Sequence, residues 1–212
     1  MKKIQSTRRE YGNKELTDEE ITVNPFTLFN TWLNQAIESG MLDASAMVLA
    51  TVDENSKPDS RVVLLKDIDE QGFIFFTHYD SPKAAQAENS GTVALNFYWR
   101  ELSKQIRIRG HIERISREAS ETYFASRPRG SQISTLASNQ STVIKNRDDL
   151  VKTVAQLTEE YQEQNIPCPS YWGGYRVVPF EFEFFLGRDN RLNDRVRYRL
   201  EDKQWLIERL SP

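Results

Sequence analysis

The sequence has very few of the side chains that carry out catalysis in enzymes without a cofactor. Cysteine occurs once, as Cys168, and histidine occurs twice, as His78 and His111. A disulfide bond within the chain is therefore excluded. Neither a zinc site of cysteine and histidine ligands nor a histidine-based catalytic triad is easily assembled. If the protein is an enzyme, we expect a bound cofactor to supply the reactive chemistry and expect no metal site.

Long apolar segments and a strong net charge are also missing. No apolar run approaches the length that spans a membrane, and the charged N-terminal segment lacks the apolar centre of a secretory signal. The 28 lysines and arginines nearly balance the 31 aspartates and glutamates, so the formal net charge is −3. Without a global excess of positive charge, binding to nucleic acid is not expected. The lone cysteine fits a reducing compartment, and we predict a cytoplasmic protein with no membrane partner.

The pattern of apolar residues predicts one mainly β domain with peripheral α-helices. Segments rich in Val, Ile, Leu and Phe, separated by short polar turns, predict five strands between residues 46 and 116 and three more after residue 180. Such a series predicts an antiparallel sheet that closes into a barrel. Residues 1–23 are expected to form a mobile N-terminal arm, and residues 24–212 the domain. Helical spacing predicts helices that begin at Pro25 and at Pro82 and that cover residues 117–127, 131–138 and 148–164.

Cations recur beside segments that otherwise have the pattern of buried elements. The predicted strand Arg61-Val-Val-Leu-Leu-Lys66 carries one at each end, and Ser81-Pro82-Lys83 places another at a helix start. Burying a cation is costly unless an anion accompanies it, so cations without matching carboxylates suggest a phosphorylated ligand. Taken alone, each segment has a simpler interpretation, namely an exposed edge strand with solvated cations and an ordinary helix capped by Ser81.

Another cation lies where two predicted helices meet. Tyr123 and Arg127 are four residues apart on one helical face, Pro128 ends that helix, and Ser131 can cap the next. A tyrosine hydroxyl, a guanidinium and a capped helix start would surround a phosphate. An ordinary helix corner with a surface arginine explains these residues equally well.

Two clusters near the C-terminus carry arginines and aromatic residues. In Arg191-Leu-Asn-Asp-Arg195, the preceding polar turn could direct a side chain into a cleft, although Asp194 could instead neutralise either arginine. Tyr171-Trp-Gly-Gly-Tyr-Arg176 predicts a packed loop or a dimer contact. The two histidines and the cysteine have no supporting pattern, and we interpret all three as structural.

Together, these segments resemble one family, the FMN-dependent pyridoxine/pyridoxamine 5'-phosphate oxidases. The resemblance covers nearly the whole chain, and the order and spacing of the segments are more specific than any one of them. It implies an FMN-binding split β-barrel, antiparallel and Greek-key-like. It also implies a homodimer with FMN in clefts at the subunit interface. The segments that carry the resemblance are Arg8–Tyr11, Pro25–Phe29, Arg61–Lys66, Ser126–Gln132, Tyr171–Arg176 and Arg191–Arg195.

The resemblance also implies which residues contact the cofactor and the substrate. The implied FMN contacts are Arg61, Val62, Val63, Leu64, Leu65, Lys66, Phe76, Thr77, Pro82, Lys83, Gln105, Gln140, Ser141, Phe185 and Arg195. The implied substrate contacts are Arg8, Tyr11, Lys66, Tyr123, Arg127, Ser131, Arg191 and Asn193. Within this second set, Lys66, Tyr123, Arg127 and Ser131 would hold the substrate phosphate. Arg191 and Asn193, the catalytic candidates, would lie over the pyridine ring.

Four positions depart from the family pattern. Asn193 stands where the family has histidine, Phe185 where it has tryptophan, Pro82 where it has arginine and Phe76 where it has tyrosine. Phe185 keeps apolar bulk without an indole N–H, and Pro82 removes one phosphate donor. Asn193 can still form hydrogen bonds but cannot take up a proton near neutral pH.

The reaction implied by the resemblance is the oxidation of pyridoxamine or pyridoxine 5'-phosphate to pyridoxal 5'-phosphate. A hydride would pass from C4' of the substrate to flavin N5, and O2 would reoxidise the flavin and yield hydrogen peroxide. One alternative is an oxidase of the same fold that acts on another ring, as in phenazine biosynthesis. The other alternative, suggested by Asn193, is a protein that binds FMN or pyridoxal phosphate without turnover.

Overall fold

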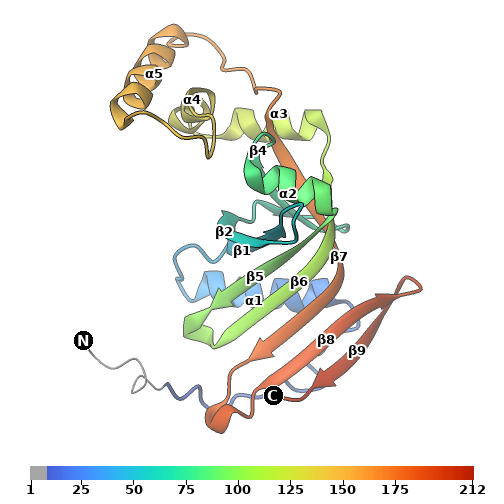
Figure 1. The fold of residues 1–212 in the computed structure, drawn as a ribbon. Helices are drawn as coiled ribbons and strands as arrows, with labels where there is room; N and C mark the ends of the chain where they lie inside the picture. The colour runs from blue at the N-terminus through green and yellow to red at the C-terminus, as the bar shows by residue number, and fades with distance from the viewer. Residues whose placement is uncertain (1–8) are drawn as a thin grey trace.

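The structure is a computed structural model that describes residues 9–212, and its centre is a strongly curved sheet of antiparallel strands (Figure 1). The strands are β1 (Ala46–Val52), β2 (Pro58–Leu64), β3 (Asp67–Ile68), β4 (Phe73–His78), β5 (Thr92–Trp99), β6 (Lys104–Arg114), β7 (Trp172–Leu186), β8 (Asp194–Glu201) and β9 (Gln204–Leu210). The helices are α1 (Pro25–Glu38), α2 (Pro82–Ser90), α3 (Arg117–Ser126), α4 (Arg129–Ala137) and α5 (Arg147–Glu160), with 3-10 turns η2 (Arg100–Leu102) and η3 (Asp189–Arg191).

Strand β7 joins the two ends of the sheet. The strand order is β2-β1-β5-β6-β7-β4-β3, and β8 and β9 continue from β7. The first half of β7 pairs with β4 and its second half pairs with β8, while β6 runs along most of its length. A register shift between Arg109 and Gly110 interrupts the β6–β7 ladder. A Cβ atom on Gly110 would lie 2.5 Å from the Val178 carbonyl oxygen, so this close approach requires glycine.

Helix α1 supplies the inner face of the sheet with its packing partner. Phe29 contacts Phe73 and Phe97, with ring centroids 4.8 and 5.1 Å apart, and Trp32 packs edge-on against Phe184 at 5.3 Å. These side chains are buried almost completely. Fully buried aromatic side chains contribute much of the hydrophobic stabilisation of a domain of this size, and this core holds the sheet in its curved form.

A second, smaller core lies at one end of the molecule. Phe124, Ile133, Ile166 and Trp172 form it, and they come from α3, α4, the segment after α5 and the start of β7. Figure 1 shows α3, α4 and α5 together at this end, far from β8 and β9 at the other. The helical end therefore faces the edge strand β2 and the part of β4 that the short strand β3 leaves unpaired (Figure 1).

Local sequence signals predicted most element boundaries correctly. Asn24 caps α1, its Oδ1 accepting a hydrogen bond from the Phe26 amide at 2.9 Å, and Gly91 ends α2 with a left-handed φ of 67°. Two local predictions were wrong. Ser131 is not a helix cap, because α4 begins at Arg129 and the Ser131 amide bonds the Pro128 carbonyl at 2.8 Å. Ser81 does not cap α2 with its side chain, since its hydroxyl donates to the His78 carbonyl at 2.7 Å.

The predicted loop at Tyr171–Arg176 is also wrong, because Trp172 to Arg176 are the first residues of β7 and pair with β4. Gly173 and Gly174 allow this pairing beside bulky neighbours. A Cβ atom on Gly173 would lie 2.0 Å from the Tyr79 hydroxyl oxygen, and one on Gly174 would lie 2.5 Å from Ile115 Cδ1. The two glycines, typical of loops in a sequence, are needed here for close packing.

The described part of the N-terminal segment runs along the β7–β8 connection. The amides of Tyr11 and Gly12 donate to Asp189 Oδ1 at 2.8 and 2.7 Å, and the amide of Leu16 donates to Asp194 Oδ2 at 3.0 Å. Leu16 itself is buried in the main core. The division into an arm and a domain at residue 23 remains a prediction, and Arg8 lies outside the described residues.

Candidate functional site

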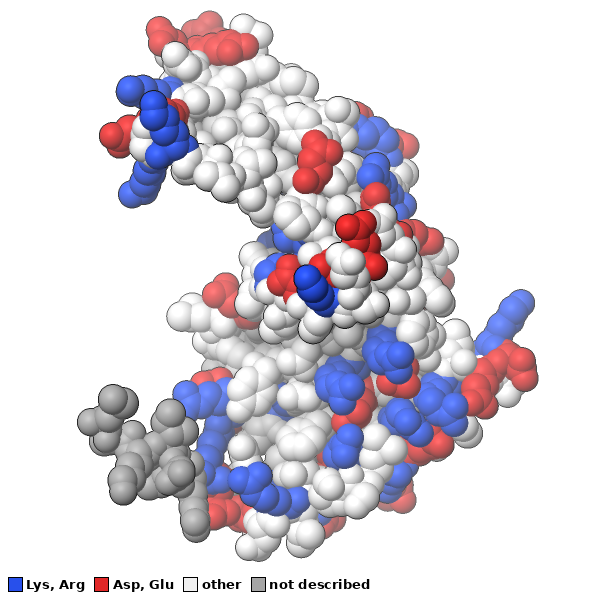
Figure 2. Space-filling view, viewed as in Figure 1, with Lys and Arg blue, Asp and Glu red and all other residues white. Residues whose placement is uncertain are grey.

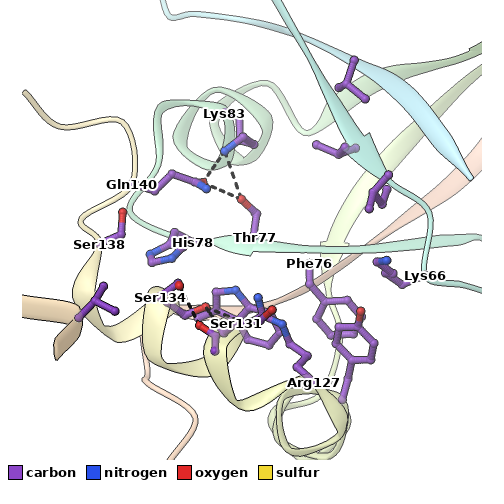
Figure 3. Close-up of a pocket in the computed structure, with 18 of the residues that line it drawn as sticks. Lys66, Phe76, Thr77, His78, Lys83, Arg127, Ser131, Ser134, Ser138 and Gln140 are labelled. Carbon is purple, nitrogen blue, oxygen red and sulfur yellow. Dashed lines mark hydrogen bonds between the residues drawn. The ribbon is translucent and has the colours of Figure 1, made fainter. Parts of the chain in front are cut away.

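A cleft of about 730 Å³ separates the helical end from the edge of the sheet. Figure 2 shows the surface hollowed between the two parts, and Figure 3 shows the side chains inside. This volume is typical of sites that bury a cofactor-sized ligand. The cleft is lined by Val62, Val63, Leu64, Lys66, Phe76, Thr77, His78, Lys83, Tyr123, Arg127, Gly130, Ser131, Ser134, Thr135, Ser138, Gln140, Leu150, Val154 and Trp172.

Lys83, at the start of α2, forms one cationic part of the cleft. Its Nζ donates to Gln140 Oε1 at 2.5 Å, to Thr77 Oγ1 at 3.2 Å and to Ser81 Oγ at 3.3 Å. Burial lowers the pKa of Lys83, and the positive charge of Arg61 lowers it further. Among residues 9–212, the hydrogen-bond partners of Lys83 are hydroxyl and amide oxygens, so its charge stays available to an anion.

Arg127 forms the second cationic part, where α3 ends and the chain becomes extended. Its guanidinium lies over the ring of Trp172, 4.7 Å from the centroid, and donates to Thr135 Oγ1 at 2.8 Å. Burial lowers the pKa of Arg127, although a guanidinium remains charged at neutral pH. An aromatic face and a hydroxyl hold this cation in place without neutralising it.

Aromatic rings form the wall between Arg127 and the strand edge. Phe76 stacks on Tyr123 with centroids 3.9 Å apart and on Trp172 at 5.3 Å. Burial raises the pKa of Tyr123, so its hydroxyl keeps its proton and can donate. Figure 3 shows Lys66 close to Phe76 in this wall. The arrangement offers a flat apolar surface with donors at its rim.

Two of the predicted cations are paired with a carboxylate. Arg61 does not line the cleft, and its Nη2 lies 2.5 Å from Asp59 while its Nη1 donates to Thr51 at 2.6 Å. Arg195 pairs with Glu183 at 2.8 Å. The expectation of unmatched cations is therefore wrong for these two arginines, because Asp59 on the same strand pairs with Arg61 and Glu183 on the neighbouring strand pairs with Arg195.

Five predicted contacts lie at the other end of the sheet. Gln105 of β6 pairs in register with Phe185 of β7, which pairs with Arg195 of β8, so the three form a row across the strands. Arg191 and Asn193 lie in the connection that precedes β8. None of these five lines the cleft described above. Figure 1 places this connection and the helical end at opposite ends of the molecule.

The geometry of the connection leaves Arg191 exposed. Asn190 and Arg191 both have left-handed backbones, with φ of 57° and 61°. Asp194 contacts Arg188 at 3.6 Å and Arg209 at 4.0 Å, so the interpretation in which it neutralises Arg191 or Arg195 is wrong.

Neighbouring side chains hold the connection in shape. Asn193 accepts a hydrogen bond from the Arg188 amide at 2.9 Å. Tyr11 lies at the same end of the sheet. A Cβ atom on Gly187 would lie 3.0 Å from the Tyr11 ring.

Three predicted FMN contacts lie near the cleft without lining it: Leu65, which is buried in the core, Pro82 and Ser141. The sequence arguments missed several residues that do line it. Leu150 and Val154 gave a signal through the helical spacing of residues 148–164, and Trp172 gave one as part of the aromatic segment Tyr171–Arg176. Those missed are His78, Gly130, Ser134, Thr135, Ser138, Leu150, Val154 and Trp172.

Within residues 9–212, no group of three or more His, Cys, Asp or Glu residues is placed to hold a metal ion. The same residues include no helix that is both long enough and apolar enough to cross a membrane.

Two family models match the chain. The model described as pyridoxamine 5'-phosphate oxidase matches residues 33–161, and the model described as pyridoxine 5'-phosphate oxidase C-terminal dimerisation region matches residues 172–212. The chain is 46% identical over 210 residues to the pyridoxine/pyridoxamine 5'-phosphate oxidase of Gloeothece citriformis (strain PCC 7424), covering 99% of this chain and 98% of the relative. It is 44% identical over 205 residues to the protein of that name from Legionella pneumophila (strain Paris), covering 97% and 95%.

A solved structure with the same fold is PhzG from Burkholderia lata 383, in complex with tetrahydrophenazine-1-carboxylic acid. It superposes with a TM-score of 0.88 at 30% identity, covering 93% of this chain and 98% of PhzG. This likeness confirms the predicted mainly antiparallel split-barrel fold.

Proposed function

The chain belongs to the pyridoxamine 5'-phosphate oxidase family, and on that premise we propose that its cleft oxidises pyridoxamine and pyridoxine 5'-phosphates to pyridoxal 5'-phosphate with FMN as cofactor. The observation that carries the proposal is the pair of cations in one cleft, Lys83 and Arg127, each held by neutral groups. FMN and the substrate each bring one phosphate, which matches two such cations.

We propose that the Lys83 part binds the FMN phosphate. Thr77 and Gln140 already bond Lys83 and each other, with a Thr77–Gln140 distance of 3.1 Å, so the three side chains are ordered before any ligand binds. Arg61 adds positive charge nearby, although its ion pair with Asp59 partly offsets that charge. The strand segment from Val62 to Leu64 lines the cleft and would lie along the flavin.

We propose that the Arg127 part binds the substrate phosphate. Tyr123 and Ser131 line the same cleft and provide hydroxyls, and Lys66 adds a second cation to its lining. Arg127 is therefore expected to select the phosphorylated form of the vitamin. When bound, FMN accepts the hydride and passes the electrons to O2, so the side chains serve to bind, orient and exclude water.

The protein is a homodimer, and we propose that the partner subunit completes each site. Residues 172–212 match the dimerisation region and include Phe185, Arg191, Asn193 and Arg195. In their own subunit these residues lie away from the cleft. Two-fold symmetry can bring these residues of one copy to the cleft of the other copy, which gives two identical sites. Arg191 would then position the reacting carbon, and Asn193 would hold the ring with one donor and one acceptor.

The substrate phosphate distinguishes this proposal from its rivals. PhzG is a relative of the same fold at lower identity, but Arg127, Tyr123 and Ser131 favour a phosphorylated substrate. Purified protein with FMN should release peroxide with pyridoxamine 5'-phosphate and much less with pyridoxamine. Equal rates would favour another ring substrate, and no peroxide would favour a binding protein. We further propose O2 as the electron acceptor and the cytoplasm as the compartment.

Mixed dimers test the shared site. At substrate concentrations well below the raised Michaelis constant of Arg127→Ala, the Arg127→Ala and Arg191→Ala subunits are each expected to be nearly inactive alone. After unfolding and refolding together, half of the dimers carry one site with both wild-type arginines, so activity should return to about a quarter of wild type. If each site were built within one subunit, the mixture would be no more active than its components.

A further inference from the structure

His78 is a titratable residue in the cleft that the proposed reaction does not use. It ends β4 and pairs with Trp172 at the start of β7. It is 7% exposed, and its ring stacks on Tyr171 with centroids 5.6 Å apart and an angle of 25°. Figure 3 shows the imidazole in the cleft between Gln140 and Ser134. It therefore lies between the Lys83 part and the helix that carries Ser131.

The charges around His78 are mostly positive. Lys83 on α2 and Arg127 at the end of α3 face it as cations, and Asp80 in the turn before α2 is the opposing carboxylate. Burial raises the pKa of Tyr171, so the stacked phenol is neutral. Helices α4 and α5 contribute hydroxyl and apolar side chains to this cleft. Burial, Lys83 and Arg127 together lower the pKa of His78 despite Asp80, so the imidazole is neutral at pH 7 in the protein alone.

We propose that His78 is a third phosphate-binding group of the cleft, which contacts a phosphate monoester as an imidazolium and so couples binding to the uptake of one proton. The inference rests on the proposed function, which supplies the two phosphate monoesters, FMN and the substrate. A phosphate dianion beside Lys83 or Arg127 offsets the charge that disfavours the imidazolium and adds a negative partner. The same residue that is neutral without ligand is then charged in the complex.

The expected pH dependence follows from the direction of these changes. The pKa of His78 lies below 6.5 in the protein alone and rises when phosphate binds. Binding is therefore strongest at low pH and is weakened as pH rises through the higher pKa of the complex. Between the two pKa values, the dissociation constant should increase by up to about tenfold per pH unit.

Proton NMR can follow this directly, because the chain has only two histidines. His111, exposed on β6 beside Phe180, is the internal reference. We expect the pKa of His78 to rise with either FMN or pyridoxal 5'-phosphate, because a bound phosphate favours the imidazolium. The ligand that causes the rise identifies which phosphate His78 contacts. An unchanged pKa of His78 with both ligands would overturn the proposal.

Variants provide a second readout. His78→Asn and His78→Gln keep a hydrogen-bonding side chain but cannot titrate. For the ligand whose phosphate His78 contacts, the change in dissociation constant between pH 6 and pH 8 should be about tenfold smaller in both variants than in the wild type. Thermal melts would check that the variants fold. If a folded variant keeps the wild-type pH dependence, the inference is refuted. This holds even if the other variant fails to fold. If wild-type protein binds neither ligand, the proposed function falls as well; tight binding with an unresponsive His78 removes the inference alone.

Discussion

Arg191→Ala is expected to slow the reduction of bound flavin by pyridoxamine 5'-phosphate by more than about a hundredfold, or ~2.7 kcal/mol of barrier. Within residues 9–212, Arg191 forms none of the ion pairs made by its neighbours Arg188 and Arg195. Its guanidinium is therefore free to hold the substrate over the flavin. Alanine keeps a Cβ at this left-handed position, so the backbone of the connection should change little. Stopped-flow absorbance under anaerobic conditions measures the rate.

The matched control is Asn193→His, two residues along the same connection. Asn193 already forms a structural hydrogen bond with the Arg188 amide. Because the amine of the substrate can lose its proton before binding, a histidine is not needed as a proton acceptor. We expect this change to alter the rate by less than about tenfold, under ~1.4 kcal/mol. A large acceleration in Asn193→His, together with a small effect in Arg191→Ala, would reverse the two roles.

Arg127→Ala is expected to raise the Michaelis constant for pyridoxamine 5'-phosphate and to leave FMN affinity nearly unchanged. A hydrogen bond to a charged group contributes about 1.5–3 kcal/mol, so the constant should rise by roughly 10- to 150-fold. The effect should be specific because Arg127 contacts Thr135 and Trp172, whereas Lys83 contacts Thr77 and Gln140. Steady-state kinetics and flavin-fluorescence titration measure the two quantities.

Arg129→Ala provides the comparison for charge and stability. Arg129 lies two residues further along and donates to the carbonyls of Tyr161 and Gln164, and it does not line the cleft. We expect its loss to affect thermal stability more than substrate affinity. An unchanged Michaelis constant in Arg127→Ala, or an equal rise in Arg129→Ala, would remove Arg127 from the phosphate site.

Secondary structure was largely predictable because its signals are local. Asn24 marks a helix start through the hydrogen bond that its side chain accepts. Gly91 marks a helix end because glycine readily adopts a left-handed backbone. The strand at Trp172 to Arg176 was missed because its two glycines are needed for contacts with Tyr79 and Ile115, which are distant in the sequence. Local composition carries no information about such contacts.

The candidate site was predictable only in part. The cations of Lys83 and Arg127 were identified from helix ends. The pairing of Arg61 with Asp59, two residues away on β2, was missed although it is local, whereas the pairing of Arg195 with Glu183 depends on how β7 and β8 lie side by side. His78 gave no signal, and Trp172 was noted only in an aromatic segment, because nothing in the local pattern shows that their strands meet beside the cleft. Under the proposed function, a site shared between two subunits explains why Arg191 and Arg195 lie away from the cleft of their own chain.

The central claim is that this chain binds FMN and reduces it with a phosphorylated vitamin B6 amine. The most direct measurement is the absorption spectrum of the purified, FMN-loaded protein before and after anaerobic addition of pyridoxamine 5'-phosphate. The account predicts a bound-flavin spectrum whose long-wavelength absorbance is bleached by the substrate and returns when air is admitted, with pyridoxal 5'-phosphate as the product. A bound flavin whose absorbance stays unchanged after the substrate is added would contradict it.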